Sequence, residues 1–176
     1  MNYSPFAPTG YFALTWSLSV EEHFYLLLSL AMLLFRQRAQ VAIVLCIATC
    51  LALRVHFAGV IPDGAIQGAS HFRLDSIAWG CLLSMIIHRR HEPRYAKVLN
   101  FMNSRNGVVI GFSLLLASFV IRDPVFRVTF RFSVQGLAFM FLFAALFYNP
   151  NKNVISRALA SRPLVYVGTI SYSLYL

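Results

Sequence analysis

Two adjacent carboxylates, a histidine and a tyrosine stand directly before an apolar run near the start of the chain. Glu21, Glu22, His23 and Tyr25 precede residues 26–35, which contain no charged side chain. Charged groups at the edge of a membrane segment are costly, and they are therefore candidates for function by default. Carboxylates and a phenol are groups that take or give a proton in catalysis, so Glu21, Glu22 and Tyr25 are candidate catalytic residues.

A structural role competes with this interpretation. Ser19 and Glu22 have the spacing of a capping box, in which each side chain satisfies an exposed N–H of the first helical turn. Carboxylates at that place also face the positive end of the helix dipole. We therefore expect a helix over 19–35 that begins near Ser19. Capping accounts for Glu22 but leaves Glu21 without a local partner.

Other polar side chains near the ends of apolar segments are candidate substrate-binding groups. His71, Arg73 and Asp75 open the segment 71–88, where they could bind a substrate or its developing negative charge. Arg73 and Asp75 have an alternative role as an ion pair between helices. Trp16 is either an aromatic anchor at the membrane interface or part of the wall of an acceptor site.

A polar stripe is expected on a later helix. Arg127, Arg131 and Gln135 recur at steps of four residues within 125–148, which places them on one helical face. The stripe could hold the phosphates of a nucleotide-bearing substrate or an anionic acceptor, and a substrate sugar or a lipid phosphate fits better than the nucleotide if the stripe begins on the outer side. Arg127 and Arg131 are therefore candidate substrate-binding residues as well.

The composition indicates an all-α, polytopic transmembrane helix bundle. The 176 residues are 59% hydrophobic and 12% charged, and the mean hydropathy is +0.67. A soluble helical core would need a polar outer face on most helices, and the sequence lacks such faces. We expect about five full spans and the start of a sixth. The expected helices cover 19–35, 40–57, 71–88, 107–121, 125–148 and a segment from 164 onward.

The basic residues are unevenly divided between the two expected sides of the membrane. Ten lie on one side: Arg36, Arg38, Arg89, Arg90, Arg94, Lys97, Arg105, Lys152, Arg157 and Arg162. Five lie on the other: Arg54, Arg73, Arg122, Arg127 and Arg131. The positive-inside rule makes the first side cytoplasmic. The ends that carry Glu21, Asp75 and Arg127 then share the outer side.

Two other kinds of site are not expected. The net charge of +9 does not indicate a nucleic-acid partner, because the basic residues fall between apolar runs and do not form one soluble face. Cys46, Cys50 and Cys81 lie inside apolar runs without metal-ligand spacing. We therefore expect no metal site and no bound cofactor.

Three segments together carry a family resemblance. Residues 16–25 read WSLSVEEHFY and resemble the W-[ST]-L-S-V-E-E-x-F-Y signature of the membrane acyltransferase type three family. Residues 72–80, FRLDSIAWG, are similar to its R-x-D-x-x-x-x-G helix. Residues 163–176, PLVYVGTISYSLYL, resemble its P-L-x-x-x-G-x-x-S-Y-x-x-Y-L segment.

The resemblance implies a membrane enzyme that moves an acyl group, usually acetyl, from cytoplasmic acyl-CoA to a hydroxyl of an exported or surface glycan. It further implies a multi-pass protein of a bacterial inner (plasma) membrane, with lipid, acyl-CoA and a glycan as partners. Residues 1–176 are expected to form one domain that matches the C-terminal half of a family member.

The family's proposed catalytic histidine lies on an earlier helix, before the signature. A separate N-terminal half is therefore an expected partner. The alternatives are an inactive gene remnant, or a transporter-like or assembly module without catalysis.

Overall fold

The computed structural model describes residues 16–34, 38–63, 66, 69–148 and 160–175. Within these ranges the regular structure is helical and contains no strand, which confirms the all-α prediction for this part of the chain. The elements are α1 (Trp16–Leu34), α2 (Ala39–Phe57), η2 (Ser70–Phe72), α4 (Leu74–His88), α5 (Pro93–Met102), α6 (Arg105–Val120), α7 (Pro124–Val128), α8 (Arg131–Tyr148) and α10 (Arg162–Tyr175).

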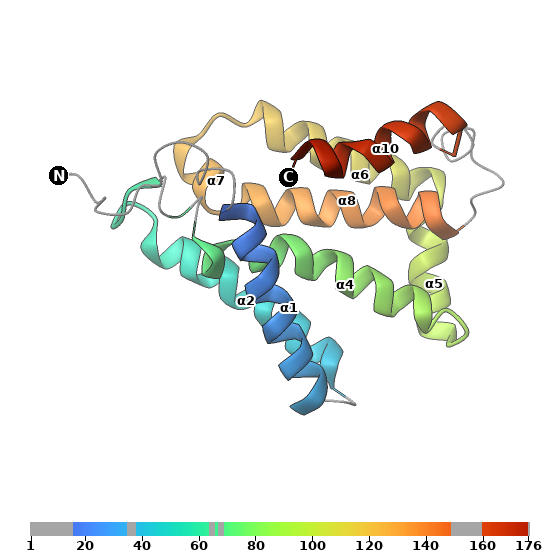
Figure 1. The fold of residues 1–176 in the computed structure, drawn as a ribbon, viewed down its shortest axis with the longest axis horizontal. Coiled ribbons are helices and arrows are strands. Elements are labelled where there is room, and N and C mark those ends of the chain that lie inside the picture. The colour runs from blue at the N-terminus through green and yellow to red at the C-terminus, as the bar shows by residue number, and fades with distance from the viewer. Residues whose placement is uncertain (1–15, 35–37, 64–65, 67–68, 149–159, 176) are drawn as a thin grey trace.

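The bundle is built around α4 and α8 (Figure 1). Helix α6 packs along one side of α8, and α2 packs against α4. Phe24 of α1 joins Ile43 of α2 and Ala78 of α4 in one buried cluster. A second cluster joins α4, α5 and α8 through Leu83, Leu99 and Met140.

The outer surface of the bundle carries many large apolar side chains. Along α6 these include Phe112, Leu116 and Phe119, which are 54%, 59% and 60% exposed. Among the described residues, one helix, Ala39–Phe57, is both long and apolar enough to cross a membrane. Shorter apolar helices cover Leu74–His88, Arg105–Val120 and Arg131–Phe147. The five expected spans therefore remain a prediction.

The first helix begins earlier than its capping box predicts. Helix α1 starts at Trp16, so Ser19 is the fourth residue of the helix and not its cap. Glu22 consequently lies in the second turn, beyond the orphan N–H groups that a capping box satisfies. Ser19 is therefore not at the cap position that the sequence predicts, and its side chain lies outside the described residues.

The segment expected as one helix over 71–88 is broken near its start. A 3₁₀ turn at Ser70–Phe72 precedes α4, and Arg73 is the N-cap residue of α4. The Phe72 carbonyl accepts a hydrogen bond from Arg54 Nη1 at 2.7 Å, while the Ser76 N–H bonds to Arg73. Because the Phe72 carbonyl already accepts a hydrogen bond from Arg54, it does not need one from an N–H of the following helical turn.

The segment expected as one helix over 125–148 is also broken. Helix α7 ends at Val128 and α8 begins at Arg131. The Thr129 hydroxyl donates to the Val125 carbonyl at 2.7 Å, a back-bond that commonly bends helices. Arg127 therefore lies on a different helix from Arg131 and Gln135, and the expected continuous stripe is wrong.

Helix α5 was not expected from the apolar pattern. Pro93 occupies its first turn, where the missing N–H costs nothing. Leu99 and Met102 are buried, whereas Arg94 and Lys97 are exposed. The helix is amphipathic and short, so it lacks the continuous apolar run by which the other segments are recognised.

Helices α4 and α8 approach closely at Gly136. A Cβ built on Gly136 would overlap the ring of Trp79. The ring belongs to a half-buried side chain that packs against both main apolar clusters, so it has little room to move. Glycine is therefore required at this crossing for steric reasons.

We predict that Gly136→Ala destabilises the protein by about 1–3 kcal/mol, because overpacking displaces the Trp79 ring. Gly80→Ala is the matched control, since a Cβ at that exposed position meets nothing within 4 Å. The melting temperatures of both variants are measured by thermal unfolding in detergent micelles. Equal melting temperatures for the two variants would contradict the close approach.

Candidate functional site

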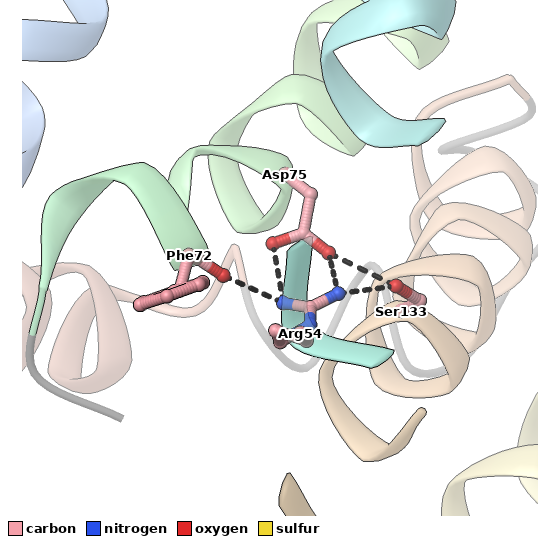
Figure 2. Close-up of polar contacts among 4 residues, drawn as sticks. All are labelled: Arg54, Phe72, Asp75 and Ser133. Atoms are coloured by element: carbon pink, nitrogen blue, oxygen red, sulfur yellow. Dashed lines mark hydrogen bonds and ion pairs between the residues drawn. The ribbon is translucent and has the colours of Figure 1, made fainter. Parts of the chain in front are cut away.

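A buried ion pair joins α2 and α4 near one end of the bundle. Arg54 of α2 and Asp75 of α4 are both completely buried, with an Nη2–Oδ2 distance of 2.6 Å. Arg54 Nη1 also donates to Asp75 Oδ1 at 3.0 Å, so the pair is bidentate. Figure 2 shows two nitrogens of the guanidinium facing the two oxygens of the carboxylate. Paired donors and acceptors of this kind are the strongest side-chain contacts in proteins.

The remaining hydrogen-bonding capacity of the pair is largely used. Arg54 Nη2 donates to Ser133 Oγ of α8 at 2.6 Å, and the Ser133 hydroxyl donates to Asp75 Oδ2 at 3.0 Å. Arg54 Nη1 donates to the Phe72 carbonyl, so the network also fixes the turn before α4 (Figure 2). Four chain segments are thus tied to one guanidinium.

This geometry assigns Asp75 a structural role. Both carboxylate oxygens are engaged, and the side chain is not exposed to a substrate. A base for an alcohol proton must be within hydrogen-bond reach of that alcohol. The arrangement therefore favours an ion pair between helices, with Arg54 as the partner of Asp75.

Arg54 was missed as a site residue, although the sequence carries a signal for it. It is the one Asp, Glu, Lys or Arg in the segment Ala39–Phe57. An ionisable side chain inside an apolar segment usually faces the protein interior and pairs with another charged group. The sequence cannot supply the partner, because Asp75 and Ser133 belong to other helices.

Arg73 and His71 lie beside the ion pair but are more accessible. Arg73 is half-buried, and its guanidinium carbon lies 4.2 Å from the centre of the Phe132 ring. The same ring lies 5.7 Å from the Arg54 guanidinium carbon. The exposed His71 ring lies against Phe72, with the ring centres 4.1 Å apart. Phe132 therefore contacts both the buried Arg54 and the half-buried Arg73.

The candidate catalytic residues and the candidate substrate-binding Trp16 lie within the first three turns of α1. Trp16 and Glu21 are part of the helix, and their side chains lie outside the described residues. Glu22 is exposed, and Tyr25 is 58% exposed with its ring against the edge of Phe24. Tyr25 therefore does not enter the apolar core that Phe24 joins.

Helix α1 nevertheless approaches the segment that carries Arg73. It contacts η2 and α4, and Phe24 packs in the same buried cluster as Leu74. Figure 1 shows the N-terminal end of α1 at the side of the bundle where α4 and α8 begin. The ends that carry Glu22, Arg73 and Arg127 therefore lie on the same side of the bundle, as the charge pattern predicts.

Arg127 and Arg131 line one pocket although they belong to different helices. The pocket has a volume of about 410 Å³. Its walls come from the end of α6, the following connection, α7 and the start of α8, and they comprise Ser118, Phe119, Ile121, Arg122, Arg127 and Arg131. Gln135, the third residue of the expected stripe, donates from Nε2 to Ser118 Oγ at 3.2 Å.

Comparisons with known proteins agree with these segments. The model of a family described as "Acyltransferase domain" matches residues 2–176. The chain therefore belongs to this acyltransferase family, which is the type three family that the three motifs resemble.

Curated relatives are also found. The chain is 25% identical over 174 residues to the O-acetyltransferase OatA of Staphylococcus aureus strain NCTC 8325 / PS 47, and equally to that of strain COL. The matched region covers 92% of this chain and 28% of the relative, so the chain spans about a quarter of the length of these proteins. No solved structure gives a significant match.

We predict that Arg54→Met or Asp75→Leu alone lowers the free energy of unfolding by about 3–5 kcal/mol, because each leaves a buried charge without its partner. The double variant Arg54→Met with Asp75→Leu recovers most of that loss, since neither charge remains. The free energies of unfolding of the two single variants and the double variant are measured in mixed micelles. Asp123→Asn is the control, because that exposed cap keeps an acceptor oxygen for the Phe126 N–H. Additive losses in the double variant would contradict the pairing.

Proposed function

We propose that this chain is the part of a membrane O-acyltransferase that receives the acceptor. The reaction is transfer of an acetyl or other short acyl group from cytoplasmic acyl-CoA to a hydroxyl of an exported or cell-surface glycan. The observation that carries the proposal is the family match over residues 2–176. The curated relatives are O-acetyltransferases, which supports the acetyl group as the one transferred.

The arrangement of polar groups supports an acceptor site at one end of the bundle. Transfer to a hydroxyl requires a base for the alcohol proton and donors for the negative charge that develops on the carbonyl oxygen. Glu21 or Glu22 supplies the base, and Tyr25 orients or relays the proton. Arg73 and His71, which lie beside α1 on η2 and its following turn, supply donors. The buried pair of Arg54 and Asp75 holds these elements in place.

The membrane location is part of the same proposal. The bundle presents large apolar side chains outward, and α2 meets the length and hydropathy of a span. We propose a multi-pass arrangement in a bacterial inner (plasma) membrane, with the ends that carry Glu22, Arg73 and Arg127 on the outer side. An earlier part of the enzyme, on the same or a separate polypeptide, supplies the family's proposed catalytic histidine and a path for acyl-CoA.

The orientation can be tested by cysteine labelling. In a chain whose native cysteines are replaced by alanine, cysteine at Val60 or Pro124 reacts with an impermeant thiol reagent added to intact cells. Cysteine at Asn103, which lies between α5 and α6, reacts only after the membrane is opened. The positive-inside rule gives this expectation, because ten basic residues are on the Asn103 side. Labelling in the reverse order would exclude the proposed topology.

The acyl-transfer proposal can be tested by co-expressing this chain with the N-terminal part of the Staphylococcus aureus relative. Membranes are supplied with radiolabelled acetyl-CoA, and acetate released from glycan by mild base is counted. We predict that Glu21→Gln lowers transfer by about 10²- to 10⁴-fold at an unchanged protein level, the range typical of a proton-transfer group.

Glu92→Gln is the matched control for this variant. Glu92 is an exposed residue before α5, and its side chain makes no capping bond. The control is expected to retain full transfer. Normal transfer by Glu21→Gln would show that Glu21 is structural, and absence of transfer by every pair that contains the chain would favour a module without catalysis.

A further inference from the structure

Three arginines meet in the pocket between α6, α7 and α8. Arg122 belongs to the connection after α6, Arg127 to α7 and Arg131 to the start of α8. Neither α7 nor the connection is part of the buried network around Arg54. The pocket is therefore a separate feature, and only two of its three arginines were expected to act together from their spacing.

No carboxylate in the described part of the chain forms an ion pair with the arginines of this pocket. Among the residues that the structure describes, the one ion pair within 4.0 Å joins Arg54 and Asp75. Asp123 is adjacent to Arg122 in sequence, but its Oδ1 accepts the Phe126 N–H at 2.7 Å and caps α7. Three like charges around one cavity repel one another unless an anion lies between them.

Arg131 is held in a position suited to binding. Its guanidinium carbon lies 5.5 Å from the centre of the Phe119 ring, a cation–π distance. Its Nε is buried and has no hydrogen-bond partner among the described residues. Arg131 also begins α8, so the positive end of that helix dipole adds to the potential.

We propose that this pocket binds a phosphoryl group, carried either by the acceptor or by a lipid of the surrounding membrane. Guanidinium groups match phosphate oxygens in pairs, and three of them suit a group that carries up to two negative charges better than a single carboxylate. The volume of about 410 Å³ leaves room for the group that bears the phosphate. The proposal rests on the proposed function only where the acceptor is the carrier.

The test measures binding to the purified full chain in a neutral detergent. Thermal unfolding is followed with added inorganic phosphate, and separately with phosphatidylglycerol in place of phosphatidylcholine in mixed micelles. Sodium chloride keeps the ionic strength constant, because exposed charges respond to salt. We expect a higher melting temperature with at least one of the two probes.

The variant Arg122→Gln with Arg127→Gln is expected to bind that probe roughly ten- to hundredfold more weakly, the effect of losing charge-assisted contacts. Both side chains are exposed in the structure, so the fold does not depend on their burial. Arg105→Gln is the matched control, since it removes an exposed arginine at the opposite end of α6. The control is expected to bind like the natural chain.

Each outcome decides the proposal. Stabilisation by inorganic phosphate that is lost in the double variant supports a free or acceptor-borne phosphoryl group. The same pattern with phosphatidylglycerol alone supports a lipid head group. No stabilisation by either probe, or equal loss in Arg105→Gln, overturns the proposed pocket. Because binding is read without acyl transfer, this failure is distinguishable from failure of the proposed function.

Discussion

The cost of burying charge governs the arrangement of this bundle. Arg54 is fully buried on the helix that best fits a membrane span, so its charge must be balanced by another chain segment. Asp75 supplies the opposite charge, and Ser133 and the Phe72 carbonyl accept further hydrogen bonds from the two Nη groups, while Arg54 Nε has no partner among the described residues. The positions of α2, η2, α4 and α8 relative to one another follow from satisfying this single guanidinium.

The same end of the bundle carries the accessible polar groups. Arg73 is the N-cap residue of α4, and the Phe132 ring lies close to both its guanidinium and that of the buried Arg54. Buried groups commonly position the more exposed side chains that meet a ligand. Here the buried pair of Arg54 and Asp75 fixes the turn next to the more exposed Arg73. The proposed acceptor site therefore depends on a network that does not itself touch the acceptor.

Apolar packing adds a second constraint. The crossing of α4 and α8 at Gly136 admits no Cβ, and a Cβ at Gly111 of α6 would approach Phe141 Cβ of α8 to 2.9 Å. Small residues let helix backbones come close, which is the main source of helix association where lipid replaces water. The packing of α8 between α4 and α6 thus brings Ser133 to the ion pair and Arg131 to the arginine pocket.

The sequence alone determined the helical class, the positions of most helices and the family. Each depends on local pattern: apolar runs long enough to pack, and signature residues such as Glu21 and Glu22. The same local patterns predict a start of α1 that is too late in the chain, and they do not predict the helix breaks at Arg73 and Thr129. The tertiary structure decided the partner of Asp75 and the convergence of the arginine pocket. Both join residues on different helices, and the free energy of such contacts does not appear in any local stretch of sequence.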